Sequence, residues 1–410
     1  MDAERLTGPL GRQALALAAQ QSDPGSLAAA DALRRVVDPD LAAAALTQVV
    51  LRRRAHAKFG AAAGRMLLTA DGLEQATRPD VATWRAERFV AAGVRRVIDL
   101  GCGLGSDAVA FCEAGLEVVA VEHDPTTAAY ARHNLDGHDA TVVTGDAEVL
   151  LPTLVDRAHP GAVGVFCDPA RRTGRGRTWR VDQFSPPWDF VVSLLGRFET
   201  ACVKLGPGLP LDLIPDGVEA RWVSHRGDPV EVGLWRRPGV AGGRAVTLLP
   251  DAADLGPSEP VDLPFGELGA FVVEPDGALL RAGLVALAHP HCRRVAPGVG
   301  YLTCDHLPSG RAASDRWGTT FEVLEVLDPG ERTLRRWVRE NAIGTLEIKK
   351  RAVDLDPAVL RRRLKPAGPR AATIIITPTA RGTRALVVRR VDPAAGGGAE
   401  STNPPDWHSA

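Results

Sequence analysis

Short apolar runs rich in β-branched residues alternate with amphipathic stretches in the middle of the chain. Most positions within each run are apolar, which is typical of strands buried on both faces of a sheet. Segments of about ten residues or more with helical periodicity lie between most of the runs. This alternation predicts strand–helix–strand units and therefore a parallel sheet. The predicted strands are RRVIDL at 95–100, EVVAVE at 117–122, ATVVTGD at 140–146, VGVFCD at 163–168 and ACVKLG at 201–206.

Two further apolar runs predict how the sheet ends. ARWVSH at 220–225 and EVGLWRR at 231–237 flank RGDPV at 226–230. A Gly-Asp turn between two such runs predicts an antiparallel hairpin that closes the sheet.

The N-terminal 90 residues have helical periodicity. The stretch at 38–60, DPDLAAAALTQVVLRRRAHAKFG, places Ala and Leu at helical spacing and has a basic final third. A second helix is predicted to start at Thr77, where TRPD supplies an N-cap threonine, a proline in the first turn and an acidic N3 residue. Gly93 is expected to end that helix.

The C-terminal half has a different pattern. Residues 240–310 are rich in Gly, Pro and Asp, with strands predicted at 245–249 and 270–274. Residues 315–390 predict a compact α/β region, with helices over RTLRRWVREN and PAVLRRRLK. The predicted divisions are a helical domain at 1–90, a sheet domain at 91–238, a small linking domain at 239–312, an α/β domain at 313–392 and a disordered tail at 393–410.

Composition excludes several classes of protein. The net charge of −1 gives no global attraction to nucleic acid, so any basic surface is local. Six cysteines without a C-x-x-C pair argue against a disulfide framework and a structural zinc site. The acidic N-terminus does not fit a signal peptide, and no apolar run approaches the roughly 18 residues of a membrane span. We therefore expect a cytoplasmic protein without a metal ion.

The stretch DLGCGLG at 99–105 carries the most chemical information. A predicted strand runs into Gly101, Gly103 and Gly105, which allow a sharp turn and bring a ligand close to the main chain. The spacing is G-x-G-x-G, whereas the dinucleotide fingerprint is G-x-G-x-x-G. Asp99 just before the turn would repel a pyrophosphate, but it could accept from an ammonium group directly or through water.

Acidic residues also end the next two predicted strands. Glu122 in VVAVEHDP suits a ribose diol, because one carboxylate accepts from both hydroxyls, and Asp146 in TGDAE is placed to accept from an adenine amino group. One acid at a strand end is unremarkable in a parallel α/β protein, but three in this order are not. An ammonium group, a ribose and an adenine together describe S-adenosylmethionine, which is the cofactor we expect.

In combination, DLGCGLG, VEHD and GDA resemble the motifs of class I S-adenosylmethionine-dependent methyltransferases over residues 94–236. The resemblance implies an α/β fold with a Rossmann-like class I methyltransferase sheet after the N-terminal helical segment. It implies these cofactor contacts: Asp99, Gly101, Gly103 and Gly105 in the loop on the methionine side, Glu122 at the ribose, and Asp146 with Ala147 at the adenine.

The fourth predicted strand ends in Asp168, Pro169, Ala170 and Arg171. Amine methyltransferases of the same family carry an Asn/Asp-Pro-Pro-aromatic motif there, whose first side chain holds the target nitrogen. The resemblance therefore implies catalytic roles for Asp168 and Pro169, and we expect Arg171 to be the third catalytic residue. The second proline and the aromatic residue are replaced, so the target atom stays open. Arg171 could stack through its guanidinium plane or bind a phosphate.

Five arginines follow this aspartate within a short glycine-containing stretch. They are Arg171, Arg172, Arg175, Arg177 and Arg180. At the entrance of an acceptor site they suit a polyanion such as RNA, and Trp179 could stack on a base. The alternative is a solvated surface loop in an arginine-rich protein.

Cysteine nucleophiles are less expected. Cys167 immediately precedes Asp168, and Cys202 lies inside the fifth predicted strand. Cys304 in YLTCD is similar to the cysteine motif of RNA uracil-5 methyltransferases but lies far beyond the predicted catalytic sheet. We expect each of the three to be a buried structural thiol.

Two more segments resemble one group of bacterial methyltransferases. GTLEIKKRAVDLDPAVLRRRLKPAG at 344–368 resembles their C-terminal α/β THUMP-like domain, and LLTADGLEQATRPDVATWRA at 67–86 resembles a segment of the same group. The latter is also similar to a helix start that helps to close the cofactor pocket of guanine N2 cap methyltransferases, which implies roles for Gln75 and Thr77. The resemblance further implies a ferredoxin-like linking domain at 239–312.

Local charge in the C-terminal region fits RNA. Residues 331–365 hold eleven Arg or Lys against five Asp or Glu. THUMP domains deliver RNA to attached catalytic domains, and Lys349, Lys350 and Arg351 are the predicted substrate contacts here, with Arg172, Arg175 and Arg177 in the earlier loop. The alternative is that these arginines only solvate helix faces.

The sequence therefore predicts an enzyme, an S-adenosylmethionine-dependent methyltransferase that acts on RNA at an exocyclic purine amine. One alternative is a methyltransferase for a small molecule or a protein. Another is a non-catalytic RNA-binding protein with a vestigial methyltransferase fold. The oligomeric state stays open.

Overall fold

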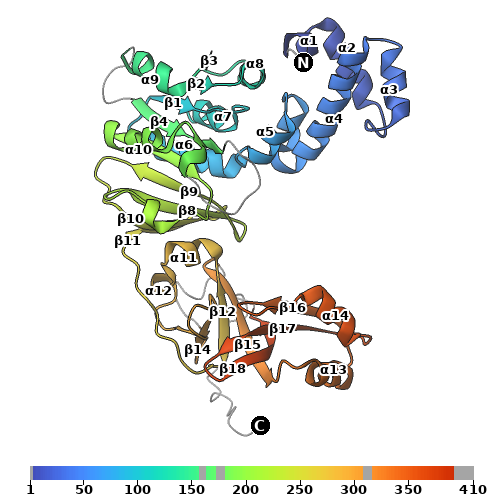
Figure 1. The fold of residues 1–410 in the computed structure, drawn as a ribbon, viewed down its shortest axis with the longest axis vertical. Helices are drawn as coiled ribbons and strands as arrows, with labels where there is room; N and C mark the ends of the chain where they lie inside the picture. The colour runs from blue at the N-terminus through green and yellow to red at the C-terminus, as the bar shows by residue number, and fades with distance from the viewer. Residues whose placement is uncertain (1–2, 157–162, 172–180, 308–315, 392–410) are drawn as a thin grey trace. The chain divides into compact units, whose positions relative to one another are not determined.

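The computed structural model describes residues 3–156, 163–171, 181–307 and 316–391, and the chain divides into two compact units (Figure 1). Unit 1 comprises residues 1–220 and 231–242, and unit 2 comprises residues 221–230 and 243–410. The predicted tail at 393–410 lies outside the described residues. The five predicted domain boundaries stay predictions.

Helices form the first part of unit 1. They are α1 (Ala3–Thr7), α2 (Pro9–Ala19), α3 (Leu27–Arg34), α4 (Pro39–Phe59), the 3-10 helix η1 (Gly60–Gly64), α5 (Ala70–Gln75) and α6 (Pro79–Ala91). Helix α4 confirms the prediction over 38–60, and the Asp38 side chain caps it by accepting from the backbone N–H of Leu41. The core of these helices includes Leu104 and Tyr130, so it is continuous with the sheet region that follows.

The start of α6 differs from the prediction. The helix begins at Pro79, Arg78 is the N-cap, and no side chain caps the helix. The Thr77 hydroxyl instead donates to Oδ2 of Asp107 at 2.6 Å. The predicted capping box is therefore wrong, because a buried carboxylate uses the threonine. Gly93 follows the helix with φ 79°, as predicted.

Parallel strands form the centre of unit 1 and confirm the strand–helix alternation (Figure 1). Their order is β3-β2-β1-β4-β7, and every neighbouring pair among them is parallel. The strands are β1 (Arg96–Leu100), β2 (Glu117–Glu122), β3 (Ala140–Thr144), β4 (Val163–Cys167) and β7 (Thr200–Leu205). All five chains run in the same direction, so their carboxyl ends share one edge of the sheet.

Helices and short segments connect these strands. They are α7 (Ser106–Glu113), α8 (Pro125–Asn134), α9 (Ala147–Asp156), β5 (Ala170–Arg171), η2 (Val181–Gln183), β6 (Phe184–Ser185), α10 (Trp188–Arg197) and η3 (Leu211–Leu213). Phe111 of α7 packs edge-on against Phe89 of α6 and Phe166 of β4, with ring centroids 5.2 and 5.5 Å apart. These aromatic contacts fix α6 and α7 against the sheet.

The predicted hairpin is present. β8 (Glu219–His225) and β9 (Asp228–Arg236) are neighbours in the sheet order, and the chain turns between them at Arg226 and Gly227 with φ of 55° and 88°. β9 runs antiparallel to β7, which confirms the reversed strand. The prediction that the hairpin closes the sheet is wrong, because the strand order continues from β8 to β10 and β11.

Unit 2 contains the predicted C-terminal α/β elements. They are β10 (Gly243–Leu249), β11 (Ala253–Ser258), β12 (Phe271–Pro275), α11 (Gly277–Ala282), α12 (Val285–Ala288), β13 (Arg293–Arg294), β14 (Leu302–Cys304), β15 (Gly318–Leu327), α13 (Glu331–Glu340), β16 (Ile343–Lys350), α14 (Pro357–Leu364), β17 (Arg370–Thr379) and β18 (Gly382–Arg390). A seven-stranded sheet has the order β13-β14-β12-β15-β18-β17-β16. Its strands therefore come both from residues 239–312 and from the C-terminal region.

One cysteine prediction is wrong. Cys304 forms a disulfide with Cys292, so it is not a free thiol. The two sulfurs meet because β13 pairs with β14 and brings the segments together. Disulfides are rare in reducing compartments, so this pair does not support the predicted cytoplasmic location.

Candidate functional site

A pocket of about 810 Å³ lies at the carboxyl edge of the parallel strands of unit 1. This volume falls within the roughly 300–1,000 Å³ that is usual for small-molecule sites. The predicted cofactor residues that line it are Gln75, Thr77, Gly101, Gly103, Glu122, Asp146 and Ala147. The other two, Asp99 and Gly105, do not line it. The predicted acceptor residues Asp168 and Pro169 line the same pocket.

The glycine turn brings the ends of β1 and β4 together. Gly101, Gly103 and Gly105 have φ of 82°, 56° and 85°, which L-residues with a side chain rarely adopt. A Cβ on Gly101 would lie 3.2 Å from the backbone oxygen of Asp168. Gly105 is the N-cap of α7, where a Cβ would lie 3.3 Å from Leu135, so its role here is packing.

Glu122 and Asp146 are oriented by backbone donors. The carboxylate of Glu122 accepts from the N–H groups of Gly103 at 3.0 Å and Asp124 at 2.9 Å. Asp146 accepts from the N–H of Glu148 at 2.8 Å through Oδ1. Each carboxylate oxygen can accept more than one hydrogen bond, so both groups can still accept from a ligand.

Asp99 lies beneath this pocket. Its side chain is fully buried, and neither carboxylate oxygen has a hydrogen-bond partner among the described residues. Burial, followed by the charge of Asp168, raises the pKa of Asp99 to about 8. A buried carboxyl without a donor is the kind of group that a cationic ligand would stabilise, so the residues present fit the ammonium side of S-adenosylmethionine.

Asp168 forms an ion pair with Lys204 of β7. The Nζ of Lys204 also donates to the Thr77 hydroxyl at 2.9 Å, and this hydroxyl donates onward to Asp107. Lys204 binds Oδ2 of Asp168, and about a third of the Asp168 side chain remains exposed. Asp168 is therefore held at the pocket wall with one oxygen available.

The hydrogen-bonded chain continues into the core of unit 1. Arg85 of α6 is fully buried and pairs with Asp107 at one side. Its Nη2 donates to both carboxylate oxygens of Glu231 at 2.6 Å, and its guanidinium lies 4.8 Å from the ring centroid of Phe166. Burial lowers the pKa of the Arg85 guanidinium, but the charge of Glu231 and its hydrogen bond, together with Cys202 and Asp168, raise this pKa overall. Asp168, Lys204, Thr77, Asp107, Arg85 and Glu231 are called the charge chain below.

The segment before α6 is attached to the glycine turn. Asn134 at the end of α8 accepts from the N–H of Leu67 at 2.8 Å and donates to the carbonyls of Leu67 and Leu104 at 3.0 Å. A Cβ on Gly72 would lie 2.7 Å from Leu104. These contacts place α5, and with it the exposed Gln75, at the pocket wall.

The structure does not describe the side chains of several predicted substrate contacts. Arg172, Arg175, Arg177 and Arg180 lie outside the described residues. Of Arg171 only the backbone is described, which pairs with Phe184 between β5 and β6. The roles predicted for these arginines stay predictions.

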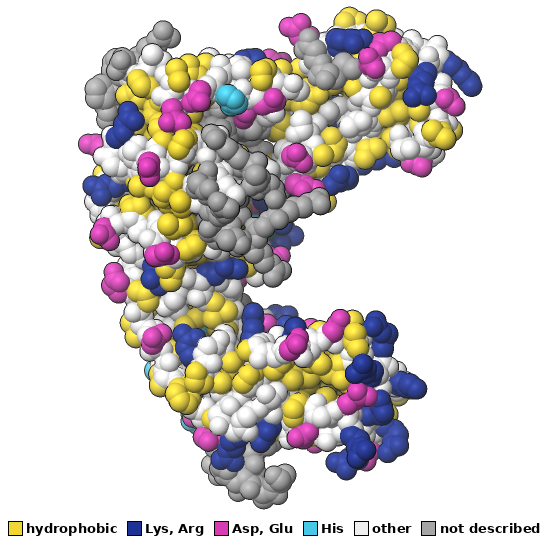
Figure 2. Space-filling view, viewed as in Figure 1, with side chains coloured by type: hydrophobic (Ala, Val, Ile, Leu, Met, Phe, Trp, Pro, Cys, Tyr) yellow, Lys and Arg dark blue, Asp and Glu magenta, His cyan; other side chains and the backbone are white. Residues whose placement is uncertain are grey.

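Two of the three predicted substrate contacts at the end of β16 already lie near an acidic side chain of the protein. Lys349 donates to Oε2 of Glu274 at 2.7 Å, and Arg351 lies 3.9 Å from the other oxygen of this carboxylate. Lys350 is exposed. Unit 2 also carries exposed cations on α13 and near the end of α14, where Figure 2 shows Lys and Arg side chains gathered.

Cys167 and Cys202 are fully buried, as predicted. Burial raises the pKa of both thiols, which keeps them protonated and weak as nucleophiles. Neither residue lines the pocket.

Sequence reasoning missed Lys204, Asp107, Arg85 and Glu231. One signal was available: ACVKLG places a single lysine near the carboxyl end of an otherwise apolar strand. A charge at such a position needs a partner or a ligand, which marks it as a candidate site residue. The partners of Lys204, which are Asp168 and Thr77, lie 36 and 127 residues away in the sequence.

Within the described ranges, no helix has the length and apolar content to cross a membrane. The same residues contain no cluster of three or more metal-ligating His, Cys, Asp or Glu side chains.

Family models match both ends of the chain. One described as THUMP domain-like matches residues 318–390, and one described as a domain of unknown function (DUF8688) matches residues 1–55.

The chain is also similar to known proteins over most of its length. Uncharacterized S-adenosylmethionine-dependent methyltransferases from two strains of Mycobacterium tuberculosis are each 33% identical over 358 residues, covering 83% of this chain and 94% of the relative. A crystal structure of a candidate methyltransferase from Porphyromonas gingivalis superposes with a TM-score of 0.74. It is 23% identical and covers 93% of this chain and 99% of that one, so it supports the fold alone.

Binding of S-adenosylmethionine is expected to release a proton from Asp99 near neutral pH. With a pKa of about 8, this carboxyl is mostly protonated at pH 7, and the positive charges of the ligand would lower its pKa. At a pH between the pKa of Asp99 in the complex and its pKa in the free protein, binding releases a proton. The affinity for S-adenosylmethionine should therefore rise with pH up to about 8. Calorimetric titrations in buffers of different ionisation enthalpy measure this release.

Asp99→Asn should abolish the proton release, because the amide does not titrate. Glu113→Gln, at an exposed position of α7, is the matched control and should leave it unchanged. Release that persists in Asp99→Asn would assign the proton to another group.

Arg85→Met is expected to destabilise unit 1 by about 3–5 kcal/mol, because Asp107 and Glu231 would remain buried without their counter-ion. Urea unfolding monitored by circular dichroism measures the change. Arg95→Met removes an exposed arginine and should alter stability by less than ~0.5 kcal/mol. Equal stability of the two variants would contradict a structural role for the charge chain.

Proposed function

Because the chain belongs to the class I S-adenosylmethionine-dependent methyltransferases with a C-terminal THUMP-like domain, we propose that this enzyme methylates RNA. Exposed cations on the THUMP-like domain carry the proposal. Arg332, Arg336 and Arg339 lie on the face of α13 opposite its buried residues Leu334 and Trp337.

These cations form a surface that suits phosphates. A pocket of about 780 Å³ between α13 and the segment after α14 is lined by Arg332, Arg335, Arg336, Arg339 and Lys365. Arg335 is held by Glu331 and the Arg363 carbonyl, whereas Arg332 and Arg336 have no acidic partner among the described residues. A surface helix needs only a few charged side chains to stay solvated. The large number of cations on this one face of α13 therefore favours binding of a polyanion.

S-adenosylmethionine supplies an electrophilic methyl group on a sulfonium when it is bound. Glu122 would accept from the ribose hydroxyls, Asp146 from the adenine amino group, and Asp99 would balance the ammonium charge. These residues would thereby orient the methyl group toward the wall that carries Asp168. This arrangement works by positioning, and it needs no cysteine nucleophile.

Asp168 would hold the acceptor nitrogen. Its oxygen that Lys204 leaves free would accept an N–H of an exocyclic amine, which points the nitrogen lone pair at the methyl group. As the new N–C bond forms and the S–C bond breaks, Asp168 or water can take the proton that the nitrogen loses. Lys204 would keep the carboxylate in this orientation. Ala170 replaces the second proline of the family motif and Arg171 replaces its aromatic residue, so base stacking would come from the Arg171 guanidinium or from another side chain.

Nucleoside mass spectrometry of a deletion strain tests the proposed function. Total RNA from the strain should lack one methylated nucleoside, and the purified enzyme should restore it with S-adenosylmethionine. Methyl transfer to that RNA should weaken steeply as salt rises, because phosphate contacts release counterions. An unchanged nucleoside profile together with no transfer to RNA would favour a small-molecule or protein substrate.

Asp168→Ala is expected to lower kcat by at least about 100-fold, while the dissociation constant of S-adenosylmethionine changes less than about threefold. The reason is that Asp168 would contact the acceptor and not the cofactor. Calorimetry and single-turnover transfer to deletion-strain RNA measure the two quantities. Asp212→Ala, at an exposed position of η3, is the matched control. A large loss of cofactor affinity in Asp168→Ala would show that this division of roles is wrong.

A further inference from the structure

We propose that unit 2 contains a second, separate site that binds the phosphodiester backbone of the RNA without reading its bases. This inference rests on the proposed RNA substrate and adds a binding site separate from the pocket beside α13. The site is a pocket of about 740 Å³ whose lining residues all belong to unit 2.

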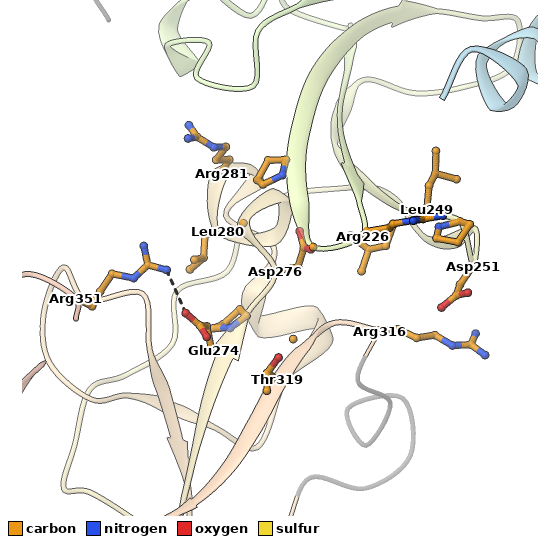
Figure 3. A pocket seen from close by; sticks show the side chains of 17 residues that line it. Arg226, Leu249, Asp251, Glu274, Asp276, Leu280, Arg281, Arg316, Thr319 and Arg351 are labelled. Carbon is orange, nitrogen blue, oxygen red and sulfur yellow. Dashed lines mark ion pairs between the residues drawn. The ribbon is translucent and has the colours of Figure 1, made fainter. Parts of the chain in front are cut away.

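Four separate turns and strand ends form the pocket (Figure 3). They are the β8–β9 turn, the β10–β11 turn, the segment from β12 into α11, and the start of β15, with Arg351 after β16. In Figure 3, Arg281 and Arg351 lie on one side and Arg226 and Arg316 on the other, with Glu274 and Asp276 between them. Cations on both sides could contact successive phosphates of one strand.

Three of these arginines form no ion pair with the residues that the structure describes. Arg226, Arg281 and Arg316 are exposed, and none of them pairs with an acidic side chain in the described part of the chain. Among the residues drawn in Figure 3, the marked ion pair joins Arg351 to Glu274 at 3.9 Å. Unpaired guanidinium groups that line one concave surface are suited to bind phosphate.

Two of the three acids in the pocket already have partners. Glu274 accepts from Lys349 at 2.7 Å and from the Tyr301 hydroxyl at 3.3 Å. Asp276 caps α11 by accepting from the N–H of Ala278 at 2.7 Å, and it accepts from Ser224 at 2.8 Å. Asp251 is the exposed acid that remains, and the four arginines of the lining exceed its three acids by one positive charge.

The rest of the lining favours the backbone over the bases. It consists of glycines, prolines and the leucines Leu248, Leu249 and Leu280, with no aromatic side chain. Sequence-tolerant and sequence-specific single-strand sites both stack bases on aromatic rings, which this pocket does not offer. The pocket therefore suits phosphate and ribose contacts.

The pocket is also distinct from the surface used for the proposed function. Arg226, Arg281 and Arg316 precede the THUMP-like match at 318–390, although Gly318, Thr319 and Arg351 of the lining lie within it. None of the cations that line the α13 pocket also lines this one; they are Arg332, Arg335, Arg336, Arg339 and Lys365.

The triple variant Arg226→Ala, Arg281→Ala, Arg316→Ala tests the site in the full chain. Fluorescence anisotropy with a labelled single-stranded RNA should show affinity about 10- to 100-fold weaker at low salt. The slope of log affinity against log salt should fall by about 2, since each phosphate contact on a single strand contributes about 0.7. Uridine-only and mixed-sequence probes should lose affinity equally, because backbone contacts carry no sequence information.

The matched control is Arg34→Ala, Arg35→Ala, Arg95→Ala, which removes three exposed arginines from unit 1 and should change neither quantity. Circular dichroism should show unaltered folding of both variants, since every substituted side chain is exposed. Wild-type affinity and salt slope in the pocket variant, or a loss confined to one probe sequence, would overturn the site while RNA binding stands. Failure of the unaltered enzyme to bind either probe at low salt would instead overturn the proposed RNA substrate.

Discussion

Buried charges must be paired, and in unit 1 this constraint links the pocket at the carboxyl edge of the sheet to helix α6. Arg85 is fully buried between Asp107 and Glu231, and Thr77 connects Asp107 to Lys204 and Asp168. Breaking such a chain at one member would leave its neighbours as unpaired ions in the core. The position of Asp168 at the pocket wall therefore depends on residues of α6, α7, β7 and β9.

Elsewhere at this pocket, a buried acidic side chain lacks a partner among the described residues. Asp99 is equally buried but accepts no hydrogen bond from the described residues, and burial raises its pKa to about 8. Glu122 and Asp146 are more accessible and already aligned by backbone N–H groups. A ligand that is cationic at one end and rich in hydroxyl and amino donors at the other satisfies all three acids. S-adenosylmethionine has both properties, so the three acids suit this cofactor.

Local patterns predicted the parallel strands, the glycine turn and the acids at strand ends, because each depends on neighbouring residues only. Thr77 was misread as a helix cap because its partner Asp107 lies 30 residues away. Lys204 was counted as part of an apolar strand, and Glu231 lies 146 residues from Arg85, so no local pattern links them. The disulfide of Cys304 was missed because only the pairing of β13 with β14 brings Cys292 close.

A crystal structure with S-adenosylhomocysteine, the demethylated product, tests the central claim most directly. We expect the ribose hydroxyls on Glu122, the adenine amino group on Asp146, and the ammonium group facing Asp99 directly or through one water. The sulfur should point toward Asp168 and its lysine. A product molecule bound elsewhere in the chain, or one in this pocket that leaves Glu122 and Asp99 without contact, would contradict the account.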